Sequence, residues 1–159
     1  QIIPSILLDT PKYKAINVHA SLLPKLRGGS PLHKCLIDGY SETGVTIMYM
    51  APGMDDGDII TQRKIDILDH YNVGDIHDKL SVLGSELLLE TLPSIFDGTN
   101  DRIPQDESLV TFAYNIKKEE EKLDFSKTAR EVHNHIRGLY PFPTSYTTLN
   151  GEIIKVKSK

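Results

Sequence analysis

Hydrophobic residues recur along the chain at two spacings, one typical of strands and one typical of helices. Residues 15–19 and 58–67 predict short strands, and residues 43–50 form an almost continuous apolar run, as in a strand buried on both faces. Ser30 can cap a short helix that begins at Pro31, because proline suits the first helical position.

The clearest helix is predicted between Asn72 and Gly98. Asn72 or Asp75 can cap its start, and Gly98 can end it. Its apolar positions recur at three- and four-residue spacings: Ile76, Leu80, Leu83, Leu87, Leu88, Leu92, Ile95 and Phe96. Helices that alternate with strands favour an α/β layer with mostly parallel strands. No G-x-G-x-x-G motif follows a predicted strand, so the sequence does not indicate a dinucleotide-binding site.

Residues 97–108 are polar and rich in turn-forming residues, which predicts a linker that could extend to Lys122. Beyond the linker, Ser126 or Thr128 can open a helix that ends at Pro141. Its expected inward-facing residues are Ala129, Val132, Ile136 and Leu139.

The dipeptide Asn150-Gly151 predicts a β-hairpin between residues 145–149 and 153–156. One helix and one hairpin are too few to bury a core alone. We therefore expect a first α/β unit over residues 1–98, a linker over 99–116 and the start of a second unit over 117–159.

The chain starts at Gln1 in an apolar run, and it stops within a strand-like pattern. We therefore expect an interior piece of a larger protein. Its 39% hydrophobic and 25% charged residues are ordinary for a globular protein, and no apolar run approaches the roughly 20 residues of a membrane span. The single cysteine, Cys35, has apolar neighbours and is expected to pack in the core; it fits a reducing compartment, so we expect a cytoplasmic protein.

The net charge is −4, but Lys and Arg outnumber Asp and Glu in residues 117–159. Such a basic segment could bind a polyanion such as RNA, or it could be an ordinary solvated surface. Lys25, Arg27 and Arg137 are candidate contacts to a nucleic acid.

Three residues have the chemistry to move an acyl-level carbon onto an amine. Asn17 and His19 are two apart, so an extended strand turns both side chains to one face, where both could approach one carbonyl oxygen. The glycine-flanked turn 53–58 presents a carboxylate, Asp55, that could orient His19 and help to take a proton.

Metal sites fit these residues poorly. The acidic turn fails as a calcium loop, because Gly57 and Ile59 would stand where oxygen ligands are required. The histidines lack zinc-ligand spacing apart from His133-x-His135, whose side chains diverge on a helix. We therefore expect no metal.

Three motifs resemble the folate-dependent formyltransferases in both order and spacing. They are residues 17–28 (NVHASLLPKLRG), 42–48 (ETGVTIM) and 53–59 (GMDDGDI). Residues 129–143 (AREVHNHIRGLYPFP) resemble the start of the C-terminal domain in the branch of that family that acts on methionyl-tRNA. The resemblance runs through nearly the whole chain.

The resemblance implies transfer of the formyl group of 10-formyltetrahydrofolate to the α-amine of initiator methionyl-tRNA, a step of translation initiation. By motif match, Asn17, His19 and Asp55 are catalytic. Four further residues are expected to line the folate site: Ser21, Leu22, Leu23 and Pro24.

The resemblance also implies the fold and the partners. Residues 1–98 would be part of a Rossmann-like α/β catalytic domain, incomplete here, and residues 117–159 the truncated start of a small OB-like β-barrel that aids tRNA binding. The partners would be the tRNA and the folate, without a membrane, and the intact protein would be a monomer.

Two alternatives stay open. The same Asn-x-His and S-L-L-P features occur in formyltransferases that act on sugar-nucleotide amines. Residues 54–58 and 133–143 favour the tRNA branch over that group. The other alternative is a non-catalytic piece that binds folate or RNA.

Overall fold

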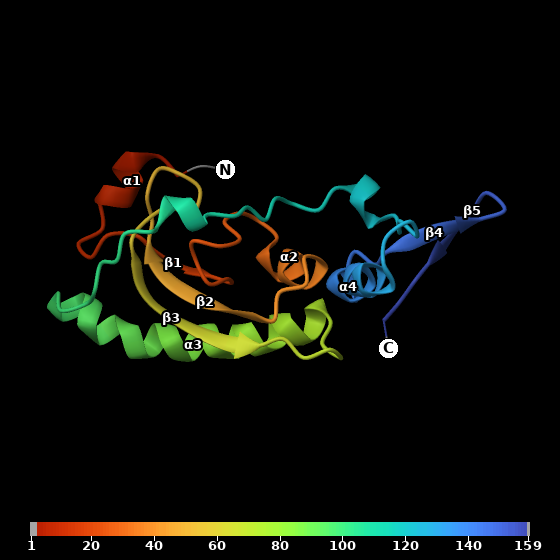
Figure 1. The fold of residues 1–159 in the computed structure, drawn as a ribbon. Coiled ribbons are helices and arrows are strands. Elements are labelled where there is room, and N and C mark those ends of the chain that lie inside the picture. The colour runs from red at the N-terminus through yellow and green to blue at the C-terminus, as the bar shows by residue number, and fades with distance from the viewer. Residues whose placement is uncertain (1–2, 159) are drawn as a thin grey trace.

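The computed structural model describes residues 3–158, which form an α/β unit followed by a helix and a projecting hairpin (Figure 1). The elements of the first unit are α1 (Ser5–Asp9), β1 (Ile16–His19), α2 (Pro31–Ile37), β2 (Glu42–Tyr49), β3 (Ile59–Asp66) and α3 (Val73–Asp97). Those of the second part are α4 (Ala129–Leu139), β4 (Tyr146–Leu149) and β5 (Glu152–Lys155). Two 3-10 turns, Glu107–Leu109 and Lys118–Glu121, lie between α3 and α4. The strands and helices predicted from the sequence are therefore present; the first two residues of the apolar lead-in lie outside the described part.

The prediction of mostly parallel strands is wrong for the sheet of the first unit. Its order is β1-β2-β3, and both pairings are antiparallel. The connection between β1 and β2 contains the helix α2, yet this pair is antiparallel, so a helix between two strands does not by itself make them parallel neighbours. The connection between β2 and β3 contains no helix. Parallel neighbours need a crossover of a dozen or more residues, whereas a short loop reverses the chain direction.

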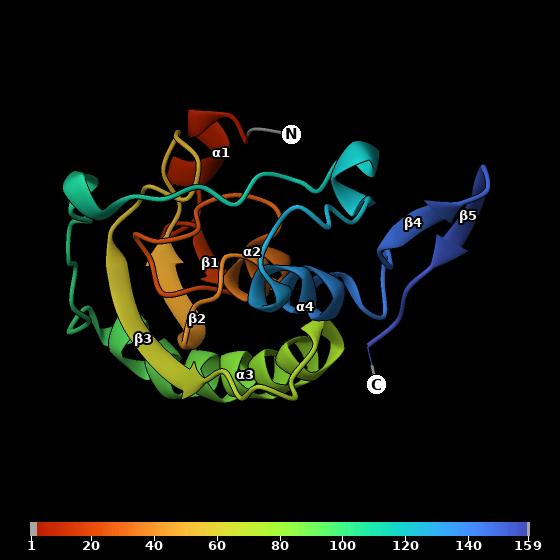
Figure 2. The ribbon, with the colours of Figure 1, turned by 45° about the vertical axis from the view of Figure 1, so that its right-hand side comes forward.

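Helix α3 covers one face of this sheet (Figures 1 and 2). The Asn72 side chain accepts hydrogen bonds from Gly74 N and Asp75 N, Asp75 bonds back to Asn72 N, and Gly98 ends the helix with a left-handed φ of 75°. The main core forms between this helix and β2, where Ile47 packs with Ile76 and other buried residues.

The opposite face of the sheet carries the polar residues of β1. Asn17 pairs with Met48, and His19 pairs with Thr46. Since side chains alternate across a strand, these four side chains lie on the face away from α3. Val18, between them, points to the helix, where its methyl group lies beside Gly84. The fold therefore separates the core face from a polar face.

Residues 99–116 run back across the first unit after α3 (Figure 2). Ile103 forms a bridge with Ile59, and Phe112 forms a bridge with Arg27. The segment predicted as a linker is therefore bonded along its length to the start of β3 and to the loop after β1.

Helix α4 packs against α2, and the expected inward-facing residues are confirmed only in part. Leu139 is fully buried as expected, whereas Ala129 is exposed and Val132 and Ile136 are half-buried. The other buried residues of the helix are Asn134, Arg137 and Gly138. At this contact Gly138 faces the backbone of α2, and Arg137 donates to the turn before α3.

Arg137 was a candidate contact to nucleic acid, and the structure rules that out for its side chain. The guanidinium is 4% exposed and donates hydrogen bonds to the carbonyl oxygens of Leu68, Asp69 and Tyr71, at 3.1, 3.4 and 3.3 Å. Burial lowers the pKa of this side chain. Arg137 therefore holds α4 to the turn before α3.

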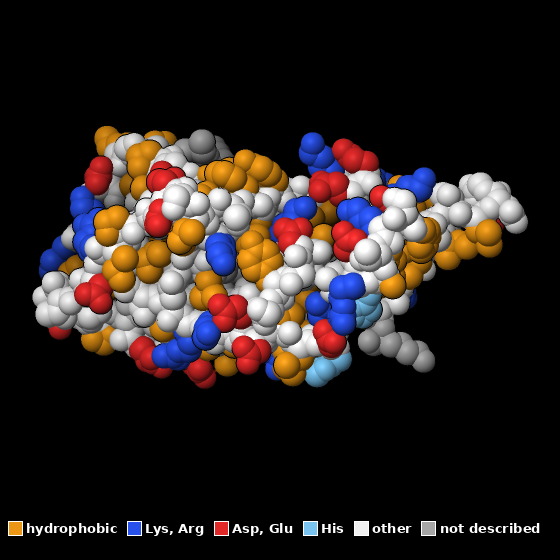
Figure 3. Space-filling view, viewed as in Figure 1, with side chains coloured by type: hydrophobic (Ala, Val, Ile, Leu, Met, Phe, Trp, Pro, Cys, Tyr) orange, Lys and Arg blue, Asp and Glu red, His pale blue; other side chains and the backbone are white. Residues whose placement is uncertain are grey.

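The hairpin of β4 and β5 forms as predicted, because Asn150 and Gly151 both have positive φ, 51° and 85°, as a type I′ turn requires. Figure 3 shows hydrophobic side chains along this arm; Leu149, Ile153 and Ile154 are exposed. Within residues 3–158 no closed barrel forms, so the OB-like barrel stays a prediction. No helix in the described part is long and apolar enough to span a membrane.

Candidate active site

The last strand residue of β1, His19, contributes a buried imidazole to the site. His19 is 6% exposed, and Asn17, two residues earlier on the same face, is half-buried. The Asn17 side chain makes no hydrogen bond to any other residue between 3 and 158. Its amide therefore has a donor and an acceptor available to a ligand.

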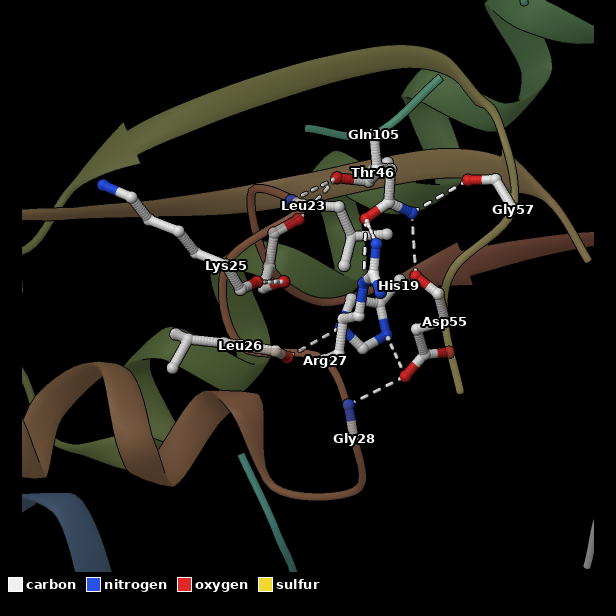
Figure 4. Close-up of polar contacts among 11 residues, drawn as sticks. His19, Leu23, Lys25, Leu26, Arg27, Gly28, Thr46, Asp55, Gly57 and Gln105 are labelled. Atoms are coloured by element: carbon white, nitrogen blue, oxygen red, sulfur yellow. Dashed lines mark hydrogen bonds and ion pairs between the residues drawn. The ribbon is translucent and has the colours of Figure 1, made fainter. Parts of the chain in front are cut away.

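Asp55 reaches this face from the loop between β2 and β3. Its backbone has φ 49°, a left-handed conformation that aspartate tolerates better than most residues. Its carboxylate accepts a hydrogen bond from Gly28 N at 2.8 Å and lies 3.6 Å from Nδ1 of His19. The structure thus brings together two side chains that are far apart in the sequence (Figure 4).

Gly57 lets the loop fold tightly. A Cβ added there would lie 1.9 Å from the carbonyl oxygen of Tyr49, so no other residue fits without movement of the backbone. This close approach fixes the end of the turn that presents Asp55.

Both ring nitrogens of His19 face oxygen acceptors. Nε2 lies 3.1 Å from the carbonyl oxygen of Leu26, and Nδ1 faces the Asp55 carboxylate. A carbonyl and a carboxylate only accept, so either ring nitrogen can present a proton to the oxygen that it faces. Asp55 and Leu26 O are thus placed to orient the His19 ring.

The loop of Ser21 to Pro24 is fixed by one hydrogen bond to the residue that follows it and two to Thr46 on β2. The Ser21 hydroxyl donates to Lys25 O at 2.7 Å, the Thr46 hydroxyl donates to Ser21 O at 2.6 Å, and Leu23 N donates to Thr46 Oγ1 at 3.2 Å. Ser21 and Leu23 are buried, whereas Leu22 and Pro24 are partly exposed. A ligand along this loop would therefore meet Leu22, Pro24 and backbone atoms.

A hollow of about 150 Å³ is lined by residues 22–26 together with Tyr40, Glu42, Thr43 and Leu109. It is smaller than the roughly 300 Å³ at the lower end of small-molecule sites. Its lining does not include Asn17, His19 or Asp55.

Sequence reasoning missed Gln105, which contacts the site, and gave Arg27 a different role. Gln105 Nε2 donates to the carbonyl oxygens of Asp55 and Gly57, both at 2.8 Å, and Gln105 Oε1 accepts from Arg27 (Figure 4). Arg27 is 4% exposed and pairs with Glu107, so it is not available as the nucleic-acid contact considered above. Gln105 lies 50 residues from Asp55 in a turn-rich segment, where no local pattern marks it.

Two family models match the chain. The model "Formyl transferase" covers residues 1–92, and the model "Formyl transferase, C-terminal domain" covers residues 115–159. Methionyl-tRNA formyltransferase of Staphylococcus epidermidis is 58% identical over 158 residues, which are 99% of this chain and 51% of that protein. The Staphylococcus aureus protein of the same name is 55% identical over 156 residues, 98% of this chain and 50% of that protein. The chain thus spans about half the length of these curated relatives.

Solved structures agree in fold at lower identity. A 4-N formyltransferase from Francisella tularensis is 27% identical with a TM-score of 0.84, over 99% of this chain and 66% of that one. An N-formyltransferase from Helicobacter canadensis is 26% identical with a TM-score of 0.78, over 87% of this chain and 52% of that one. That second structure contains folinic acid and dTDP-3-aminofucose.

Proposed function

The chain belongs to the formyl transferase family, and from that membership we propose that the natural protein carrying it formylates the α-amine of methionyl-tRNA. Its first unit has the Rossmann-like α/β fold of the family, followed by the start of the C-terminal domain. Identity of 55–58% to methionyl-tRNA formyltransferases supports this acceptor. The proposal includes a role in translation initiation, in the cytoplasm and as a monomer.

The formyl donor in this proposal is 10-formyltetrahydrofolate. The amine nitrogen attacks the formyl carbon, and the carbonyl oxygen becomes an oxyanion. Collapse of this tetrahedral species breaks the bond to N10 of the folate, which leaves with a proton, and the amine loses one. Residues must therefore stabilise an oxyanion and move a proton.

Asn17 and His19 are assigned to the oxyanion and Asp55 to the proton. The observation that carries this assignment is the 3.6 Å contact between His19 Nδ1 and Asp55 Oδ2, on the sheet face that also presents Asn17. One oriented donor typically contributes about 2.7–4 kcal/mol to an oxyanion transition state. The carboxylate is 21% exposed against 6% for the ring, so Asp55 is the more accessible group for the proton of the amine.

The loop of Ser21 to Pro24 is proposed to lie along the folate. Pro24 and Leu22 offer an apolar wall for a flat ring, and the buried Ser21 hydroxyl keeps the loop in place. The folate derivative in the Helicobacter canadensis structure supports a folate donor for this fold.

A sugar-nucleotide amine is the second candidate acceptor. The Helicobacter canadensis structure named above contains the sugar nucleotide dTDP-3-aminofucose, but that protein is only 26% identical to this chain. The higher identity to the tRNA enzymes favours methionyl-tRNA.

The test is formyl transfer by the natural protein that carries this chain, with charged initiator tRNA and an amino-sugar nucleotide as rival acceptors. Asp55→Asn is expected to lower kcat by about 10²- to 10⁴-fold, because it removes the proton acceptor. Asp56→Asn is the matched control, since Asp56 is the exposed neighbour in the same loop. Preference for the sugar would overturn the acceptor, and an Asp55→Asn variant within a few-fold of the parent would overturn the assigned chemistry.

A further inference from the structure

We propose that Gln105 is a positioning residue that holds the Asp55 loop against His19. Through Gln105, the segment 103–113 then supports the active site from outside and is more than a passive connection. The inference rests on the proposed function, because Gln105 acts on the reaction only through Asp55.

The Gln105 amide binds the loop at two points. Its Nε2 donates to the carbonyl oxygens of Asp55 and Gly57, each at 2.8 Å. Both are backbone groups that flank the turn, and Asp55 itself has the left-handed φ of 49°. Residues in such sparsely populated conformations persist only where their surroundings hold them. The two hydrogen bonds supply that restraint.

Arg27 fixes which way the Gln105 amide points. Its Nε and Nη2 atoms donate to Gln105 Oε1 at 3.0 and 2.8 Å. A guanidinium only donates, so the oxygen of the amide must face Arg27 and the NH₂ group must face the loop. Arg27 is itself almost fully buried and is held by Glu107 at 2.7 Å.

The backbone on both sides of Gln105 is anchored. Before it, Ile103 and Ile59 exchange two hydrogen bonds of 2.8 and 2.9 Å. After it, Thr111 O accepts from Arg27 N at 2.9 Å, and Ala113 N donates to Arg27 O at 2.7 Å. Gln105 therefore lies on a fixed backbone between the two loops it connects.

The same segment also supports the other partner of His19. Thr111 Oγ1 accepts from Leu26 N at 2.9 Å, and Leu26 O is the acceptor that faces His19 Nε2. The two loops whose oxygens face the His19 ring are thus held by two side chains of this segment, Gln105 and Thr111. Misplacement of a catalytic group by about 1 Å can cost 10²-fold in rate, so loss of this support should reach the reaction.

Gln105→Glu tests the proposal most directly. It keeps the size of the side chain and its contact with Arg27, but it replaces the NH₂ donor with an oxygen that faces two carbonyl oxygens. We expect kcat to fall by about tenfold or more. The KM values for folate and acceptor should change less than about twofold, because Gln105 binds neither substrate in this proposal.

Asp106→Asn is the matched control. It makes the reverse exchange of acid and amide one residue away, where the exposed carboxylate accepts hydrogen bonds from Ser108. Its kcat should equal that of the parent. The ring nitrogen NMR signals of His19 should move in Gln105→Glu and stay in place in Asp106→Asn.

A double-mutant cycle separates positioning from general stability. If Gln105 acts through Asp55, Gln105→Glu should add little to the loss already caused by Asp55→Asn. Full additivity, an unchanged His19 signal or a parental kcat would each overturn the proposal. If the parent protein shows no formyl transfer, the proposed function is wrong instead. The NMR signals of His19 then still test whether Gln105 positions His19 and Asp55.

Discussion

Burial decides what single side chains can do in this protein. Cys35 is fully buried, and burial raises the pKa of its thiol to about 12. A thiol in that state is a poor nucleophile at neutral pH, which agrees with its expected role in packing. The pKa of His135 shifts in the opposite direction and is lowered, because desolvation disfavours the charged form of a base.

His135 lies on α4 beside Glu120, and its Nε2 is buried without a hydrogen-bond partner among residues 3–158. Burial is the main cause that lowers its pKa; Lys127 and Lys34 act in the same direction, whereas Glu120 opposes them. The folded state therefore binds fewer protons at this ring than the unfolded chain, in which the pKa is about 6.5.

A pH dependence of stability follows from His135. Its contribution is fully present above pH about 6.5 and is lost as the pH falls through the lowered pKa of the folded state. The midpoint of thermal unfolding should thus drop between about pH 7 and 5, and His135→Gln should drop less. His133→Gln, at an exposed position of the same helix, is the control. Equal drops in the parent and in His135→Gln would contradict this origin.

At the scale of elements, the loop between β2 and β3 determines where Asp55 stands. Gly57→Ala would place a Cβ 1.9 Å from Tyr49 O, so the loop backbone must shift. We expect kcat for formyl transfer to fall by about tenfold or more, because the carboxylate moves away from His19.

The control for this loop is Gly98→Ala at the end of α3. Gly98 has φ 75° and no atom within 4 Å of an added Cβ, so the variant should cost roughly 1 kcal/mol of stability without touching the site. Thermal unfolding and kcat of both variants are measured together. If Gly57→Ala keeps parental kcat after correction for the folded fraction, the loop does not control the site.

Local patterns predicted the elements well because each has its own signals. Helix α3 had a cap at Asn72, a stop at Gly98 and apolar residues at helical spacing, and the hairpin had its Asn150-Gly151 turn. The predicted strand direction was wrong because alternation of helices and strands does not fix it: β1 and β2 are antiparallel although α2 lies between them, and no helix lies between β2 and β3.

Residues of the candidate site could be proposed from the sequence only where they lie in short local motifs. Asn17 and His19 share one strand, and Asp55 sits in a glycine-flanked turn, so their residue types could be recognised together. Gln105 could not be recognised, because its partners are backbone carbonyls 48 and 50 residues away. Every residue has a backbone carbonyl, so the residue types do not indicate which carbonyls accept a hydrogen bond from a distant side chain.

At the scale of the whole molecule, the contact between α2 and α4 joins the first unit to the helix and hairpin that follow. At its centre the two backbones come close at Gly138. His33 Nδ1 donates to Gly138 O at 2.8 Å, and Arg137 next to it binds the carbonyl oxygens of the turn before α3. This contact places α4 beside α2 in both ribbon views (Figures 1 and 2).

Gly138→Ala tests whether this close contact holds the two parts together. The added Cβ would lie 2.6 Å from Ile37 Cγ1 and 3.2 Å from both His33 O and Ile37 N, so α4 must move away from α2. Such overpacking typically costs about 1–3 kcal/mol. Hydrogen exchange should therefore speed up at the backbone amides of α4 and α2, while β2 and β3, whose core lies against α3, keep their protection. His133→Ala, on the exposed side of α4, should leave exchange near the parental rate. Uniform loss of protection in Gly138→Ala would mean instead that α4 and the sheet unfold as one cooperative unit.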